Sequence, residues 1–462
     1  MSFQIRRRTL MLGGLAATGA VAGLASSAHA ERELPLVPTR NPLIERRADP
    51  FITHPVRGMY YFTGSVPEYD RIVVRGAGTI EGLATAAETV VWRRPAGGRM
   101  AGHIWAPELH RIDGRWYIYF AAGDSDDVFR VRMYVLESPL ADPRDPSGWV
   151  LRGRIETEWD GFSLDATTFE HGRRRYLVWA QSEPEIAVNT SLYIAEMASP
   201  FALATKPTRI ATPTRGWEIQ GFRVNEGPAV IVRNGRVFVT FSASATDSRY
   251  CMGLLTADDG ADLLDRASWV KNPDPVFVSN EHTRQFGPGH NSFTVTPDGT
   301  DLLVYHARDY RDIAGDPLYD PNRHTRVQQL YWHRDGTPLF GVPVGAGGPI
   351  VRLTPSDVPR GFLRHSSFVL RVDADVRELA DSQFRFVAAA DGTETLQSVN
   401  YPDRHVTVAG GGVRLEPGPG TAFRRTTRGP GVTLELAGAP GTFLRHDRGI
   451  VTTGREMTFL LG

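Results

Sequence analysis

A layout that recurs about every sixty residues constrains the fold of this chain more than any other sequence feature. Each copy has a polar residue, a short apolar run, a turn with charged or glycine residues, and then a β-branched and aromatic run. The copies start at five positions, which are Asp49, Ala106, Asp165, Glu226 and His290. Asp-Gly or Asn-Gly dipeptides form the turns at 113–114, 234–235 and 298–299, and they are strong β-hairpin signals. The repeat therefore predicts antiparallel strand pairs.

Further strand signals extend each copy to a complete sheet. Runs such as RMYVLES, SLYIAEM and CMGLLTA follow the copies, and no segment has a long helical periodicity. An antiparallel unit of four strands repeated five times predicts an all-β chain with a five-bladed β-propeller. The innermost strand of each blade lines the central channel, so the polar residues at the starts of these strands are expected to converge at one end of it.

Three of these converging positions are carboxylates, Asp49, Asp165 and Glu226. Unpaired carboxylates repel one another, so a cluster of three needs a chemical reason. Glycoside hydrolysis needs a protonated carboxyl group that donates to the leaving oxygen and an ionised carboxylate that activates water or attacks the sugar. A third carboxylate beside the acid raises its pKa and orients it. Singly, Asp49 before Pro50 also fits a turn cap, and Asp165 a strand-end acceptor; the shared blade spacing favours catalysis.

The residues around these positions carry a family resemblance. The motifs RADPFI, HIWAPELH, SLDATTF, NEGPAVI and GPGHNSF resemble the inner-strand motifs of family-43 glycoside hydrolases, and the similarity runs over about residues 40–345. That family comprises inverting arabinofuranosidases, arabinanases and β-xylosidases on five-bladed propellers. The resemblance implies that Asp49 is the general base and Glu226 the general acid. It also implies that Asp165 orients Glu226 and raises its pKa.

Aromatic and basic side chains near the motifs are candidates for substrate contacts. Trp105 resembles a sugar-facing aromatic residue at the funnel wall, although a Trp before a strand is also common in cores. Phe222, four residues before the general acid, is a second aromatic candidate. Arg308 and Arg326 have the reach to contact substrate, with surface ion pairing as the alternative. Glu108, two residues past an Ala-Pro pair, is expected to be structural.

His290, in the motif GHNSF, matches a histidine that in some family members lies in the channel near a bound calcium or other ion. Calcium prefers oxygen ligands, so a metal role for His290 would act through waters. Contact with substrate and a structural hydrogen bond are the other interpretations. The chemistry requires no cofactor, and a structural calcium or other ion in the propeller channel is the one metal considered.

A shorter repeat follows the propeller segment. Residues 341–359 read GVPVGAGGPIVRLTPSDVP, a glycine- and proline-rich passage typical of a linker. Three strand-rich copies of about 40 residues come next, and they predict a small β-trefoil. The copies resemble the family-42 carbohydrate-binding module, which binds arabinofuranose side chains.

The second resemblance implies sugar-binding residues within these copies. Each pocket of that module uses the histidine of an LRH motif and an aspartate three residues before the phenylalanine of an FR motif. Copy one keeps both, as His365 and Asp381. Copy two has Val408 and a glycine at these positions and is expected to be empty, and copy three has His446 with Glu456 in place of the aspartate. A buried strand histidine is the alternative interpretation of His365.

The first thirty residues have the pattern of an export signal. Arg7 and Arg8 precede an apolar stretch rich in glycine and alanine, which ends in Ala28-His29-Ala30. This pattern resembles a twin-arginine signal. The stretch is too short for a permanent membrane span, so we expect cleavage after Ala30 and secretion.

Charge and cysteine content exclude other classes of function. A formal net charge of +0 provides neither a basic footprint for nucleic acid nor a polybasic patch for a membrane surface. Cys251 is the single cysteine, so the chain has no internal disulfide, and we expect this residue in the core. The protein is expected to be a monomer.

Together these features predict a secreted enzyme with a propeller over residues 31–345 and a trefoil over residues 346–462. The expected activity is that of an inverting exo-α-L-arabinofuranosidase acting on 1,5-linked arabinan or arabino-oligosaccharides of plant cell walls. A β-xylosidase or an arabinoxylan arabinofuranohydrolase is the alternative activity. A non-catalytic carbohydrate-binding protein is the alternative of another class. Inversion predicts a gap of about 6.5–9.5 Å between the carboxyl groups of Asp49 and Glu226, which admits a water.

Overall fold

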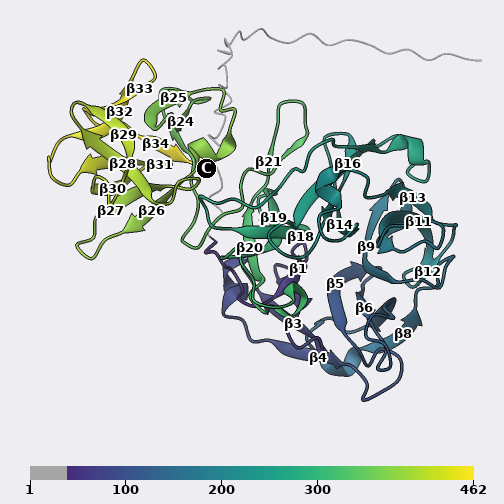
Figure 1. The fold of residues 1–462 in the computed structure, drawn as a ribbon. Helices are drawn as coiled ribbons and strands as arrows, with labels where there is room; N and C mark the ends of the chain where they lie inside the picture. The colour runs from purple at the N-terminus through teal and green to yellow at the C-terminus, as the bar shows by residue number, and fades with distance from the viewer. Residues whose placement is uncertain (1–38) are drawn as a thin grey trace, which may run out of the picture. The chain divides into compact units, whose positions relative to one another are not determined.

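The computed structural model describes residues 39–462, and the export signal predicted for residues 1–30 lies outside them. Five β-sheets within residues 48–329 form the blades of a β-propeller (Figure 1). A sheet of twelve strands follows from Leu353 onward. Within the described residues the helical segments are 3-10 turns of three or four residues, which confirms the all-β prediction. No helix in this part of the chain is long and apolar enough to cross a membrane.

The first three blades follow the chain order from the inside outward. Blade one contains β1 (Ala48–Ile52), β2 (Tyr60–Ser65), β3 (Arg71–Ala77) and β4 (Thr89–Arg93). Blade two contains β5 (Ile104–Ile112), β6 (Arg115–Ala122), β7 (Arg132–Ser138) and β8 (Val150–Arg154). Blade three contains β9 (Ser163–His171), β10 (Arg174–Gln181), β11 (Ser191–Ser199), β12 (Ala202–Leu203) and β13 (Thr208–Ala211). Both β12 and β13 pair with β11, so this blade has five strands instead of the predicted four.

The last two blades close the ring. Blade four contains β14 (Asn225–Arg233), β15 (Arg236–Ala243), β16 (Cys251–Asp258) and β17 (Val270–Lys271). Blade five contains β18 (Phe286–Val295), β19 (Asp301–Arg308) and β20 (His324–Gln329). The predicted fourth strand of blade five is missing from this sheet, because β21 (Tyr331–Trp332) pairs with β22 (Pro338–Leu339) instead. Ile44 bridges to Thr325 on β20 in its place, so the start of the described chain joins the last blade.

The remaining elements are the C-terminal strands and the 3-10 turns. The twelve-stranded sheet contains β23 (Leu353–Pro355), β24 (Phe362–Ser366), β25 (Val369–Asp373), β26 (Phe384–Ala388), β27 (Glu394–Ser398), β28 (Arg404–Ala409), β29 (Gly412–Pro417), β30 (Phe423–Arg428), β31 (Gly431–Leu436), β32 (Phe443–Asp447), β33 (Ile450–Gly454) and β34 (Phe459–Leu461). The turns are η1 (Glu81–Ala84), η2 (Pro146–Gly148), η3 (Gly216–Glu218), η4 (Arg266–Ser268), η5 (Pro317–Tyr319) and η6 (Leu379–Ser382). Sixteen buried apolar side chains form a core of their own within the C-terminal sheet.

The inner strands β1, β5, β9, β14 and β18 surround the middle of the propeller (Figure 1). Each contacts the next one in the chain, and β18 contacts β1, so the ring is closed. Large apolar side chains pack between neighbouring blades, for example Tyr119, Trp179 and Tyr193, which are fully buried. β-Branched and aromatic residues suit such pleated, buried surfaces. The packed sheets hold the five inner strands as a rigid frame for the residues at their starts.

Every inner strand has a β-bulge near its start, where the register against the second strand of the blade shifts. One residue of each bulge has a left-handed backbone: Asp49 (φ 51°), Ala106 (φ 44°), Asp165 (φ 58°), Gly227 (φ 54°) and His290 (φ 40°). Bulges bend a strand and re-aim its side chains, and residues other than glycine rarely adopt a positive φ. The bulges place successive residues, such as Leu164 and Asp165, at the same end of the channel.

Gly227 occupies the bulge position of blade four for two reasons. Its φ of 54° is unfavourable for a residue with a side chain. A Cβ atom there would also lie 3.0 Å from Cγ of His290, which is closer than ordinary packing allows. The glycine thus lets His290 enter the middle of the ring beside Glu226.

Candidate active site

A cavity of about 440 Å³ lies at the end of the channel where the inner strands begin. This volume is typical of small-molecule sites. Side chains from all five blades line it, and its polar lining residues include Asp49, Asp165, Glu226, Tyr250, His290 and Arg323. The convergence of the three carboxylates in one cavity agrees with the placement that the repeat predicted.

Asp49 lies at the centre of a network that favours its ionised form. Ser65 Oγ donates to Asp49 Oδ2 at 2.6 Å, and Arg323 Nη1 donates to Oδ1 at 3.4 Å. His290 Nδ1 lies 3.4 Å from the same Oδ1. Burial alone would raise the pKa of Asp49, but the positive charges of His290 and Arg323 and the Ser65 hydrogen bond together hold that pKa well below its ordinary range. Asp49 is therefore a carboxylate at any pH near neutrality.

The backbone of Asp49 is held by a histidine in a defined tautomer. The Asp49 N–H donates to His306 Nδ1 at 3.1 Å, so the ring proton of His306 is on Nε2. Burial and the charge of Arg323 hold the pKa of His306 well below its ordinary value, and this histidine is neutral. Its ring stacks on Tyr250, with centroids 5.8 Å apart and planes at 4°. His306 thus contacts both the backbone of Asp49 and the ring of Tyr250, which is the hydrogen-bond partner of Glu226.

Glu226 has the opposite electrostatic environment. Tyr250 Oη donates to Glu226 Oε1 at 2.8 Å, which leaves Oε2 for another partner. Desolvation by the surrounding protein and the negative charge of Asp165 raise the pKa of Glu226 to about 7. At neutral pH a substantial fraction of Glu226 therefore carries a proton while Asp49 does not.

Asp165 and His290 both interact with the charges of Asp49 and Glu226. Asp165 Oδ2 accepts a hydrogen bond from Gly227 N at 2.9 Å and lies 3.9 Å from His290 Nδ1. Burial and the charge of Asp49 raise the pKa of Asp165 despite the attraction of His290. Burial opposes a charge on His290, but the surrounding carboxylates outweigh it and raise the pKa of that imidazole. The bond to Gly227 fixes Asp165 against the residue that follows Glu226.

Three of the sequence-derived substrate candidates face this cavity. Trp105, Phe222 and His290 all line it; Phe222 is 57% exposed, while Trp105 is buried. The ring of Trp105 stacks on His103 with centroids 4.9 Å apart, so the indole has a fixed position in the cavity wall. An apolar wall of this kind suits the hydrophobic face of a sugar ring.

Arg308 and Arg326 do not line the cavity, and the prediction that Arg308 binds substrate needs correction. Both guanidinium groups are fully buried and are therefore not surface ion pairs either. Arg308 binds Asp320 and two backbone carbonyls, and Arg326 binds Asp309. Arg323 is the arginine that reaches the cavity.

Sequence reasoning missed Arg323 and Tyr250, although a signal for both was present. Tyr250 directly precedes β16 and Arg323 directly precedes β20. This is the strand-start position that identified the carboxylates. The sequence candidate in this segment was Arg326, which lies within β20, and the residue directly before the strand was overlooked.

The surroundings of His290 offer few oxygen ligands for an ion. Its Nδ1 faces Asp49 and Asp165 at 3.4 and 3.9 Å and forms ion pairs with them when protonated. Within the described residues, no group of three or more His, Cys, Asp or Glu side chains has the spacing of a metal site. These side chains do not fit a calcium ion, which takes six to eight oxygen ligands, and no catalytic step below uses a metal.

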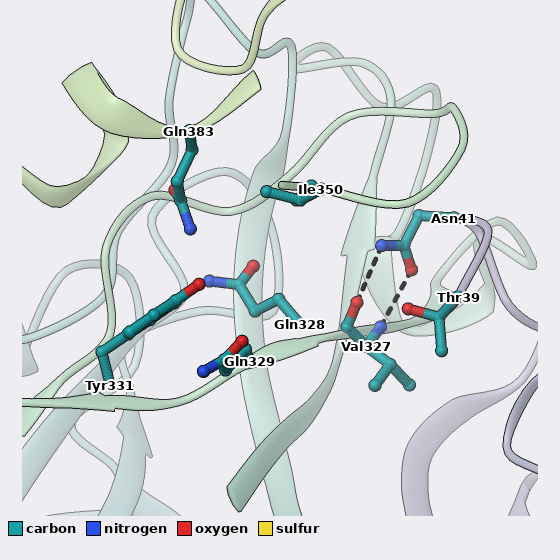
Figure 2. Close-up of a pocket in the computed structure, with 8 residues that line it drawn as sticks. All are labelled: Thr39, Asn41, Val327, Gln328, Gln329, Tyr331, Ile350 and Gln383. Carbon is teal, nitrogen blue, oxygen red and sulfur yellow. Dashed lines mark hydrogen bonds between the residues drawn. The ribbon is translucent and has the colours of Figure 1, made fainter. Parts of the chain in front are cut away.

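Two further pockets differ in character. A cavity of about 500 Å³ lies at the opposite end of the inner strands, and Glu108 lines it with Oε2 2.8 Å from His110 Nε2. The pocket in Figure 2 lies beside β20, where Asn41 exchanges hydrogen bonds with the backbone of Val327. Its volume of about 20 Å³ holds at most one water. Both Glu108 and Asn41 therefore have structural partners outside the carboxylate cavity.

The C-terminal candidates have polar partners of their own. His365 Nε2 lies 3.2 Å from Asp381 Oδ1, so the two residues that the family-42 resemblance implies for copy one are neighbours. His446 Nε2 lies 3.0 Å from Asp357 Oδ1, whereas Glu456 forms an ion pair with Arg428. The partner of His446 is thus Asp357, which the alignment of copy three did not identify, because it precedes the first copy in the chain.

A five-bladed propeller whose channel holds one carboxylate kept ionised by basic neighbours and another carboxyl group with a raised pKa has the architecture of a glycoside hydrolase. Comparison with known families agrees with this class. The chain belongs to glycosyl hydrolases family 43, which it matches over residues 39–338.

Relatives with established names are similar over most of the chain. An extracellular exo-α-(1→5)-L-arabinofuranosidase of Streptomyces avermitilis is 53% identical over 395 residues, which are 85% of this chain and 82% of that protein. The α-L-arabinofuranosidase 43 of Humicola insolens is 48% identical, with 93% of this chain and 94% of that protein covered. The crystal structure of α-L-arabinofuranosidase from Lactobacillus brevis has 55% identity and a TM-score of 0.65, and covers 67% of this chain and 98% of that one.

Proposed function

We propose that this protein is a secreted exo-acting α-L-arabinofuranosidase that releases arabinose from 1,5-linked arabinan or arabino-oligosaccharides with inversion. The observation that carries the proposal is that two carboxyl groups in one cavity have opposite surroundings, with Ser65 and Arg323 bound to Asp49 and the charge of Asp165 acting on Glu226. The pKa of Asp49 is held well below its ordinary range, while that of Glu226 is raised to about 7. The names of the relatives from Streptomyces avermitilis and Humicola insolens supply the sugar, the linkage and the extracellular location.

In the proposed mechanism, Asp49 is the general base and Glu226 is the general acid. Asp49 accepts a proton from a water whose oxygen bonds to the anomeric carbon. The bond from that carbon to the glycosidic oxygen breaks, and Glu226 transfers its proton to the leaving oxygen. Water enters on the face opposite the leaving group, so the released arabinose has the inverted, β configuration. The predicted gap of about 6.5–9.5 Å between the two carboxyl groups provides room for this water.

The neighbouring residues maintain these protonation states. Arg323 and Ser65 stabilise the negative charge of Asp49. Asp165, held by the N–H of Gly227, raises the pKa of Glu226 by its negative charge. Trp105 and Phe222 provide the apolar surface for the sugar rings. No step in this mechanism requires a metal or an organic cofactor.

Proton NMR of a fresh reaction with 1,5-linked arabinotriose tests the proposed function. We expect the β-anomer of arabinose to accumulate first, before mutarotation, together with arabinobiose as the first shortened product. Early α-arabinose would contradict inversion. With linear 1,5-linked arabinan as the substrate, early release of oligosaccharides instead of arabinose would contradict exo action. Hydrolysis of a nitrophenyl β-xyloside in place of arabinotriose would favour the β-xylosidase alternative. Binding without any product would favour a carbohydrate-binding protein.

We also propose that residues 346–462 form a β-trefoil that binds arabinofuranose side chains. The support is a sheet of twelve strands with a core of its own, and two histidines that each face an aspartate. At the first site Asn400 Nδ2 also donates to Asp381 Oδ1 at 2.9 Å, and the ring of Tyr401 lies 5.5 Å from that of His365. Small-molecule sites combine aromatic or apolar side chains with a few polar groups, and this cluster has both.

Affinity electrophoresis on arabinoxylan tests this second site. The full-length Glu226→Gln variant serves as the parent, because it is expected to leave the polysaccharide intact. Adding His365→Ala is expected to weaken retention, since the substitution removes the imidazole from the Asp381 pair. Adding Val408→Ala serves as the control, because copy two lacks the histidine and is expected to be empty. Equal retention of all three proteins would contradict sugar binding at His365.

The export route is a further proposal. The relative from Streptomyces avermitilis is named extracellular, which agrees with secretion of this chain. Arg7 and Arg8 support export by the twin-arginine route. Replacing both with lysine is expected to abolish secretion, and unchanged secretion would contradict this route.

A further inference from the structure

Arg308 on β19 is a buried arginine that connects two walls of the active cavity. Its side chain is 1% exposed. Nη1 donates to the carbonyl of Thr246 at 2.7 Å, and Nη2 donates to the carbonyl of Pro317 at 2.8 Å. Nε donates to Asp320 Oδ1 at 3.0 Å, which provides the countercharge. Thr246 and Pro317 both line the cavity, but they lie on loops from different blades.

The first of these loops leads to the general acid of the proposed mechanism. Residues 244–246 and Tyr250 line the cavity between β15 and β16. The N–H of Tyr250 donates to the carbonyl of Asp247 at 3.1 Å, so the turn is compact. Tyr250 Oη then donates to Glu226 Oε1 at 2.8 Å. A movement of the Thr246 carbonyl therefore changes the position of the hydroxyl group that orients Glu226.

The second loop carries η5 and leads to the general base. Leu318 follows Pro317 and also lines the cavity. Its carbonyl accepts a hydrogen bond from Tyr69 Oη at 2.5 Å. Tyr69 in turn accepts from Arg323 Nη2 at 2.8 Å, and Arg323 contacts Asp49. The loop is thus linked to the residue that keeps Asp49 ionised.

Only an arginine satisfies all three acceptors from this position. A guanidinium group presents its N–H donors in a rigid planar fork, whereas a lysine ammonium is a compact point charge. Burying a charged group is unfavourable unless it is paired and hydrogen-bonded. The fold keeps this charge in the interior, with one carboxylate and two carbonyls arranged around it.

We infer that Arg308 is a positioning residue that holds the Thr246 and Pro317 loops at the separation the substrate requires. This inference rests on the proposed function only for the identity of the substrate. It assigns Arg308 no contact with the sugar. Its role is to fix the loop that carries Leu318 and the turn that carries Tyr250.

The test compares Arg308→Lys with Arg326→Lys. Arg326 on β20 is a matched control, because it is also fully buried and also pairs with one carboxylate, Asp309. Its backbone partner is the carbonyl of Val344, away from the cavity. Both lysine variants keep the positive charge and lose the planar set of guanidinium N–H donors. We expect Arg308→Lys to raise the KM for arabinotriose and lower kcat/KM by about 10- to 100-fold, with Arg326→Lys close to wild type.

Two further measurements separate positioning from general loss of stability. Hydrogen–deuterium exchange is expected to accelerate in residues 244–250 and 312–320 of Arg308→Lys and to stay unchanged there in Arg326→Lys. The Tyr250 bond favours the ionised form of Glu226, so its loosening is expected to shift the basic limb of the pH–rate profile of Arg308→Lys upward.

Equal exchange and equal kinetics in the two variants would overturn the inference. The exchange experiment needs no substrate, so it tests the role of Arg308 even if the wild-type protein does not hydrolyse arabinotriose. If the wild type does not hydrolyse arabinotriose but exchange is still accelerated in Arg308→Lys, the result contradicts the proposed function and supports the role of Arg308. Accelerated exchange throughout the propeller, at the same level in both variants, would show a loss of stability instead of loop positioning.

Discussion

The Glu226→Gln variant is expected to hydrolyse arabinotriose about 10²- to 10⁴-fold more slowly than the wild type, the usual contribution of a general acid. Glutamine keeps the size of the side chain and an oxygen that accepts the Tyr250 hydrogen bond. It has no acidic proton for the glycosidic oxygen, so the leaving sugar departs as an unprotonated alkoxide. The measurement is kcat/KM for arabinotriose by quantification of released arabinose.

A nitrophenyl arabinofuranoside distinguishes loss of the acid from general damage. Nitrophenolate leaves without protonation, so Glu226→Gln is expected to lose much less activity on this substrate than on arabinotriose. Glu108→Gln is the matched control, because Glu108 is a buried carboxylate on an inner strand that pairs with His110 at the other end of the channel. Equal losses on the two substrates would contradict the role of Glu226 as the acid.

The pH dependence of the wild type follows from the same residue. Glu226 must carry a proton to act, and its pKa is raised to about 7. The protonated fraction falls as the pH rises through this value, so kcat/KM for arabinotriose is expected to decline on the basic side of about pH 7. Asp49 keeps its charge far into the acid range because its pKa is lowered. In Glu226→Gln, the basic limb is expected to disappear from the residual activity on the nitrophenyl substrate.

The Asp49→Asn variant is expected to lose about 10²- to 10⁴-fold in kcat/KM on arabinotriose and on the nitrophenyl substrate alike. Asparagine fills the same space beside Ser65 and Arg323 but cannot accept a proton from water. Both substrates need the attacking water, whatever their leaving group. A similar loss of kcat/KM on both substrates is therefore expected when the base is removed, whereas removal of the acid affects arabinotriose more strongly. The measurement is the ratio of the two losses.

Ser65→Ala provides the comparison for this variant. It removes one hydrogen bond to Asp49 Oδ2 and leaves the carboxylate in place. A smaller loss is expected, because the charges of His290 and Arg323 still favour the ionised form. Asp49→Asn with more than about a tenth of the wild-type activity on either substrate would show that Asp49 is not the base.

The overall architecture was predictable because it depends on patterns that are local in the sequence. Hairpin turns and alternating apolar runs recur at blade spacing, and five such units close into a ring without long-range information. The convergence of Asp49, Asp165 and Glu226 followed from the same spacing. The strand count of blade five was less predictable, because Ile44, which lies far away in the sequence, forms a bridge to Thr325 on β20.

The detailed geometry of the cavity depends on contacts between distant segments. Asp49 and Asp165 are bulge residues, whereas Glu226 precedes the bulge of its blade by one residue. A shift of one residue normally moves a side chain to the opposite face of a strand. At a bulge this alternation of side chains between the two faces is interrupted. The positions of the bulges could not be read from the sequence alone.

The roles of the arginines also could not be predicted from the sequence alone. Arg308 and Arg323 are both near the end of the propeller sequence, and only the fold distinguishes the one that connects two loops from the one that contacts Asp49. Their roles depend on Thr246 and Tyr69, which come from other blades, and on Pro317 in the loop between β19 and β20.

The sequence by itself determined the repeat, the all-β class, the carboxylate set and the family, because these properties depend on residue types at regular spacings. The tertiary structure alone decided which further side chains, such as Tyr250 and Arg323, share the cavity with the carboxylates and which groups are ionised. Those properties depend on distances, burial and charges between segments as far apart as Asp49 and Arg323. The pKa values of Asp49 and Glu226 diverge because the closed ring surrounds one with positive charges and the other with a carboxylate and protein atoms that exclude water.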